Sequence, residues 1–90
     1  MQAYRIHKTV IAADIPEEAR DFYLEEIGGA LPDVIEEVAY LAEVFCAGGT
    51  VKTVKERINE EMYARNAWLK MGIPCELHWP FVIGTLICQS

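Results

Sequence analysis

The chain has 90 residues, carries a net charge of −6 and is 52% hydrophobic. This length is that of one small domain, 1–90, and the apolar content excludes an intrinsically disordered chain. The acidic balance argues against direct nucleic-acid binding, because Lys and Arg make the phosphate contacts.

A strand followed by a helix is predicted at the start of the chain. Polar and apolar side chains alternate there, which indicates a strand over about 3–13 with one face toward a core. Pro16 suits the first helical position, and Glu17 and Glu18 lie where the helix dipole favours anions. The pair Gly28–Gly29 ends this helix.

Two further helices are predicted in the middle of the chain. Apolar residues recur over 34–45 at the spacing of a buried helix face, so a second helix begins near the sequence LPDVIEE. Gly48–Gly49 ends it. Thr50 is suited to cap a third helix, which is expected from about Val51 to Met71.

Two short strands, or one bent strand, follow. CELHW (75–79) alternates in polarity, with Cys75 and Trp79 inward and His78 outward, and FVIGTLIC (81–88) is rich in β-branched residues. The order β-α-α-α-β-β favours an α+β domain, with three helices packed on one face of a two- or three-stranded, mainly antiparallel sheet. Because FVIGTLIC has no charge to protect a sheet edge, a homodimer is expected.

The cysteines and histidines offer a metal site as one alternative. Cys46, Cys75, His78 and Cys88 would supply a Cys₃His zinc set, but only Cys75 and His78 are closely spaced. In a strand these two side chains would lie on opposite faces. Buried free cysteines are commonly apolar fillers. No metal and no cofactor is therefore predicted, and this set remains the weaker alternative.

The sequence signals for catalysis, phosphate binding and DNA binding are weaker. Cys75 with His78 or His7 lacks a third orienting residue, so whether the chain is an enzyme stays open, with the balance against catalysis. The predicted helix start at Gly48-Gly49-Thr50 would hold a phosphate on free N–H groups, although it lacks the P-loop spacing. Together with the Cys75/His78 region it gives the alternative function, a small-molecule or metal-binding protein. A helix-turn-helix at this turn is disfavoured by the acidic neighbouring helices.

The distribution of charge is the most informative feature. Ten acidic residues and one basic residue lie between Asp14 and Glu43, a net charge of −9, while the rest of the chain carries +3. If the first two predicted helices present these carboxylates on one wall, their field steers a basic partner. The alternative is that they are ordinary solvated faces, neutralised by the third helix.

The cellular location is predicted from two kinds of segment, a secretory signal and a membrane span. The first residues do not have the layout of a secretory signal, and the longest mostly apolar run, 73–88, is too short and too polar for a membrane span. Three irregularly spaced cysteines suit a reducing compartment. A cytoplasmic protein that does not bind membranes is expected.

The sequence thus predicts a small acidic adaptor or inhibitor that binds a macromolecular partner, a protein with a basic patch. Trp68 lies off the apolar stripe of its predicted helix, and tryptophan is enriched at binding hot spots. The residues predicted to contact the partner are Glu17, Glu18, Asp21, Glu25, Glu26, Glu36, Glu37 and Trp68.

Overall fold

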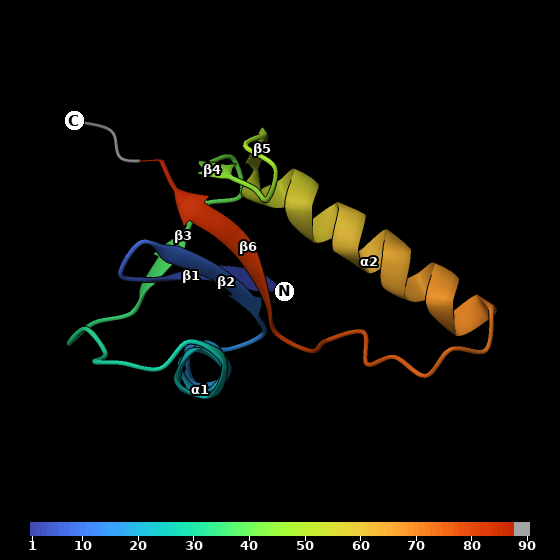
Figure 1. Ribbon diagram of the computed structural model, residues 1–90, viewed down its shortest axis with the longest axis horizontal. Helices are drawn as coiled ribbons and strands as arrows, with labels where there is room; N and C mark the ends of the chain where they lie inside the picture. Colours follow the sequence, from blue (N-terminus) through green and yellow to red (C-terminus); the bar gives the residue numbers. More distant parts are fainter. Residues whose placement is uncertain (88–90) are drawn as a thin grey trace.

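The computed structural model describes residues 1–87, and over this range the chain forms a curled six-stranded antiparallel sheet and two helices (Figure 1). The elements are β1 (Gln2–Ile6), β2 (Thr9–Ala13), α1 (Pro16–Glu26), β3 (Glu36–Val38), β4 (Glu43–Phe45), β5 (Val51–Thr53), α2 (Val54–Lys70) and β6 (Phe81–Leu86). The sheet order is β3-β1-β2-β6-β4-β5. The expected arrangement of three helices on a two- or three-stranded sheet is therefore wrong.

Two apolar clusters form the core, one on each face of the sheet. The cluster under α2 comprises Ala3, Val10, Ala12, Val44, Val54, Ile58 and Ile83. The cluster under α1 comprises Tyr4, Ile6, Ile11, Ala13, Ala19 and Tyr23. Successive residues of β1 and β2 alternate between the clusters, as side chains of a strand must. The helices thus cover opposite faces, not one face as expected.

The segment expected as one strand, 3–13, is the β1–β2 hairpin. His7 occupies its turn with φ 54°, a left-handed conformation that is uncommon outside glycine. The ring Nε2 of His7 lies 2.7 Å from the carbonyl oxygen of Ala30. Most of β2 is buried, because helices cover both faces. The expectation of a single core-facing side is wrong.

The segment expected as the second helix forms β3, a turn and β4. The helical pattern places Val34 and Leu41 inside, but they are 70% and 78% exposed, whereas Val44 is fully buried. β3 pairs with β1, with Glu37 opposite Tyr4, and β4 pairs with β6. The apolar spacing was that of a helix, but pairing with distant strands determines this part of the fold.

The Gly48–Gly49 pair lies in the turn of the β4–β5 hairpin and not at a helix start. Both glycines have positive φ, 87° and 81°, which favours glycine. The N–H of Cys46 donates to the carbonyl oxygen of Thr50 across the turn, at 2.8 Å. The phosphate-binding helix start considered above is therefore absent at these residues, and Thr50 caps no helix.

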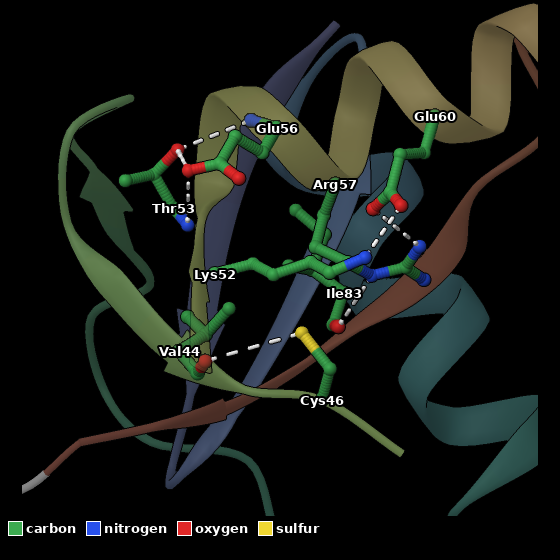
Figure 2. Close-up of polar contacts among 8 residues, drawn as sticks. All are labelled: Val44, Cys46, Lys52, Thr53, Glu56, Arg57, Glu60 and Ile83. Carbon is green, nitrogen blue, oxygen red and sulfur yellow. Dashed lines mark hydrogen bonds and ion pairs between the residues drawn. The ribbon is translucent and has the colours of Figure 1, made fainter. Parts of the chain in front are cut away.

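The helix α2 begins three residues later than expected, after a capping box. The hydroxyl of Thr53 accepts from the backbone N–H of Glu56 at 3.2 Å, and the Glu56 carboxylate accepts from the backbone N–H of Thr53 (Figure 2). This reciprocal pair satisfies two N–H groups that a helix start leaves unpaired. The helix ends at Lys70, and Gly72 follows with φ 80°, close to the predicted stop.

The strand β6 lies inside the sheet, between β2 and β4. It approaches β4 so closely that a Cβ on Gly84 would lie 2.2 Å from the carbonyl oxygen of Phe45. Since β6 is not an edge, the argument for a homodimer through FVIGTLIC does not hold, and the oligomeric state stays a prediction.

The segment 71–80 returns from the end of α2 to β6 as an irregular loop (Figure 1). The strand expected at 75–79 is absent, and Trp79, expected to face inward, is 54% exposed. Neither helix of residues 1–87 combines the length and the apolar composition that a membrane span requires.

Candidate functional site

A groove of about 580 Å³ lies between α1 and the loop 71–80. Its walls combine five carboxylates with aromatic and aliphatic side chains, and no Lys or Arg is among them. The lining residues are Asp14, Glu18, Asp21, Phe22 and Glu25 on one side and Glu76, Leu77, His78, Trp79 and Pro80 on the other.

Helical periodicity supplies the first wall. Glu18, Asp21, Phe22 and Glu25 recur at the three- and four-residue steps that place side chains on one face of a helix. Ala19 and Tyr23, on the neighbouring face, are buried against the sheet. Docking of α1 through these two residues leaves the acidic row facing the loop.

The carboxylates of the groove are only partly compensated. Asp14 lies 3.8 Å from the N-terminal ammonium and 3.2 Å from Nδ1 of His78. Asp21 lies 3.5 Å from Nε of Arg20, with both side chains exposed. Glu18, Glu25 and Glu76 form no ion pair within residues 1–87.

Three basic side chains on or beside α2 are engaged with acids of that helix. Figure 2 shows Lys52 and Arg57 paired with Glu60. The distances are 2.5 Å for Lys52 and 3.7 Å for Arg57, and Arg65 lies 3.2 Å from Glu61. These are ion pairs with acids of α2 itself. No base of the long helix forms an ion pair with an acid of α1 within residues 1–87, in contrast to the neutralisation considered from the sequence.

The hydroxyl of Tyr4, in the sheet, is affected by burial and by nearby acids, of which only Asp14 lines the groove. Burial, and then the charges of Glu37, Glu17 and Asp14, raise the pKa of the Tyr4 hydroxyl above its ordinary value. Burial and negative charge both disfavour the ionised form of a tyrosine, so they act in the same direction here.

Arg65 of α2 holds the second wall in place. Its Nη1 donates to the carbonyl oxygens of Glu76, Leu77 and Trp79 at 3.3, 3.0 and 2.7 Å, and its guanidinium carbon lies 5.0 Å from the ring centroid of Phe81. Arg65 is 5% exposed. One buried cation therefore fixes the backbone of the loop that faces α1.

Arg65 lies on the buried side of its helix. Val54, Ile58, Met62 and Arg65 follow one another at steps of four, four and three residues, so the helical pattern already placed Arg65 on the buried side. This spacing is the signal that could have identified it.

Three of the predicted partner-binding residues meet in the groove: Glu18, Asp21 and Glu25. The others lie outside its lining. Glu17 and Glu26 are exposed elsewhere on α1, and Glu36 and Glu37 lie on β3, where Glu36 is 2.8 Å from Arg5. Asp14, Phe22 and the loop 76–80 were not predicted to bind a partner, and within this loop only His78 was named, in the alternative site with Cys75.

Trp68 lines a second, smaller cavity of about 290 Å³ beside the groove. Its other lining residues are Glu61, Arg65, Cys75, Glu76 and Trp79. Glu76 and Trp79 belong to both cavities, so the two adjoin at these side chains.

The Cys/His set does not assemble in the described part of the chain. Cys75 lines the second cavity, His78 lines the groove, and Sγ of Cys46 lies 3.9 Å from the carbonyl oxygen of Val44 (Figure 2). Cys88 lies outside the described residues. Within residues 1–87 no three His, Cys, Asp or Glu side chains form a group that could hold a metal ion.

The groove is suited to bind a cation that has an apolar stem. Carboxylates attract the charge, and the faces of Trp79 and Phe22 attract both the cation and the methylenes that carry it. No protein-family model, curated protein or solved structure matches the chain. The interpretation of the groove therefore depends on its own residues.

Proposed function

We propose that this protein is an interaction module and that the groove between α1 and the loop 71–80 binds a basic segment of a partner protein. The observation that carries the proposal is the meeting of five carboxylates and an apolar lining, without Lys or Arg, in one groove. The volume of about 580 Å³ lies within the range of about 300–1,000 Å³ typical of ligand sites.

The two kinds of side chain have different tasks in such an interaction. Unpaired carboxylates such as Glu18 and Glu25 accelerate the arrival of a basic segment and set its orientation. The apolar surface of Trp79, Phe22 and Leu77 supplies affinity when the stems of Lys or Arg cover it.

The experiment compares two double variants of the same helix. Glu18→Gln/Glu25→Gln removes two charges that line the groove, and Glu17→Gln/Glu26→Gln removes two exposed charges that do not. The probe is the peptide acetyl-Gly-Arg-Gly-Arg-Gly-Gly-amide, with Glu in place of Arg as the negative control. Binding is measured by isothermal titration calorimetry at about 0.02 M and about 0.15 M salt.

The groove double variant is expected to weaken binding roughly fivefold, since each exposed ion pair contributes about 0.2–1 kcal/mol. The control variant should bind within about twofold of the parent at the higher salt, where the Debye length is about 8 Å. Equal losses in both variants, or equal binding of the Glu peptide, would overturn the proposal. Equal affinity for free arginine would point to a small organic cation as the ligand.

A further inference from the structure

We propose that the partner segment carries an apolar side chain next to its basic residues, and that this side chain enters the second cavity against Trp68. The inference depends on the proposed function and adds a second, apolar subsite to it. It starts from an independent observation, namely that the second cavity adjoins the groove and has a different lining.

The two cavities adjoin at Trp79. Both Trp79 and Glu76 line the groove and the second cavity, so a chain that crosses Trp79 reaches both spaces. An extended peptide advances about 3.3 Å per residue and alternates its side chains. Neighbouring residues of one short segment can therefore enter different cavities.

Two of the three charged side chains of the second cavity, Arg65 and Glu61, are paired with each other, whereas Glu76, which also lines the groove, forms no ion pair within residues 1–87. Arg65 is buried, lies 3.2 Å from the carboxylate of Glu61 and donates to three carbonyl oxygens of the loop. A charged ligand group would have to compete with these contacts. Since the groove offers four further carboxylates beside the shared Glu76, the basic residues of the segment belong there.

The remaining surface of the second cavity is suited to an apolar group. Trp68 and Trp79 are 43% and 54% exposed, so much of each indole is unburied in this structure. A volume of about 290 Å³ lies at the lower limit of ligand sites, a size suited to one large side chain. An aromatic or aliphatic residue would bury both rings, and buried tryptophans are frequent binding hot spots.

The test uses the Arg–Gly peptide of the previous section and a set of derivatives in which one glycine at a time is replaced by Phe. The readout is the ratio of the Kd of the parent peptide to the Kd of each derivative. One position of Phe is expected to raise affinity about tenfold, somewhat less than the effect of a full hot-spot residue. The other positions should give a ratio near one.

Two aromatic variants of the same helix locate the effect. Trp68→Ala should reduce the best ratio to about one, whereas Tyr63→Ala should keep it near ten, because Tyr63 is 80% exposed and lines neither cavity. Circular dichroism and urea unfolding verify that both variants are folded. Trp68→Phe is the second variant in case Trp68→Ala unfolds, and it should retain part of the gain.

The outcomes separate the two proposals. If the Arg–Gly peptide does not bind the parent protein, the proposed function itself fails. If that peptide binds through Glu18 and Glu25 but no Phe derivative binds more tightly, the second subsite is refuted. A gain that is unchanged in the Trp68 variants places the Phe elsewhere and refutes it equally.

Discussion

Replacing Arg65 by methionine removes the contacts that attach the loop 71–80 to α2. Methionine keeps a long apolar side chain beside Phe81 but has no donor for the carbonyl oxygens of Glu76, Leu77 and Trp79. The carboxylate of Glu61, which is 25% exposed, loses its cation as well.

The expected loss follows from these contacts. Removing one partner of a buried ion pair costs about 3–5 kcal/mol. Water can reach the carbonyl oxygens of the partly exposed loop once Arg65 is gone, so the lower value, about 3 kcal/mol, applies here. The total stability of a chain of 90 residues is roughly 4–14 kcal/mol. The substitution therefore removes a large fraction of it.

Urea unfolding followed by tryptophan fluorescence measures this loss. With a slope of about 1.5 kcal/mol per M, Arg65→Met should lower the midpoint by about 2 M. Arg20→Met is the matched control, since the side chain of Arg20 is 47% exposed and pairs with exposed Asp21, and it should change stability by less than about 0.5 kcal/mol. A shift below about 0.3 M for Arg65→Met would refute the assignment of Arg65 as the residue that holds the loop.

Two further substitutions test the sheet and the surface charges. Gly84→Ala should destabilise the protein by about 1–3 kcal/mol, because the new methyl group meets the Phe45 carbonyl oxygen and separates β6 from β4; urea unfolding that is unchanged would contradict this. The hydrogen bond from Lys52 holds the pKa of Glu60 below its ordinary value, so this pair stabilises the fold above the ordinary carboxyl range and its contribution is lost as the pH falls through the folded-state pKa. Glu60→Gln should therefore lower the thermal midpoint at about pH 7, and its difference from the parent should shrink as the pH falls below the ordinary carboxyl range; a difference that does not change with pH would disprove the linkage.

Local signals in the sequence predicted several elements of the fold. Pro16 and the acids after it indicated the start of α1, and Gly72 marked the end of α2. A strand was also expected where β6 lies. Each of these features depends on neighbours in the sequence, and that is why the sequence alone could indicate them.

The second predicted helix was wrong because its apolar spacing fits two structures. Val44, which the helical pattern left out, is fully buried, while Leu41, which the pattern included, is exposed. The segment contains two three-residue strands, β3 and β4, and they pair with β1 and β6. A strand of three residues is too short to show a recognisable alternation of polar and apolar side chains. The conformation of this segment is therefore determined by pairing with strands that are distant in the sequence.

The candidate site could be predicted only in part, because one wall depends on local spacing and the other on a tertiary contact. The spacing of Glu18, Asp21 and Glu25 on one helix is a local property, and these acids were named. The opposite wall is an irregular loop whose path depends on the buried Arg65, a tertiary contact. The charge count along the chain could not show that Glu76 joins the acids of α1.

The position of β6 has a consequence for the synthesis of the protein. It is the last of the described elements along the chain, yet β2 and β4 are connected in the sheet only through it. While the ribosome is still translating residues 81–86, the β1–β2 hairpin and the β4–β5 hairpin cannot join. Contacts of such long sequence separation form slowly. Nascent chains that stop before this strand would expose the edges of β2 and β4 to aggregation and to proteases.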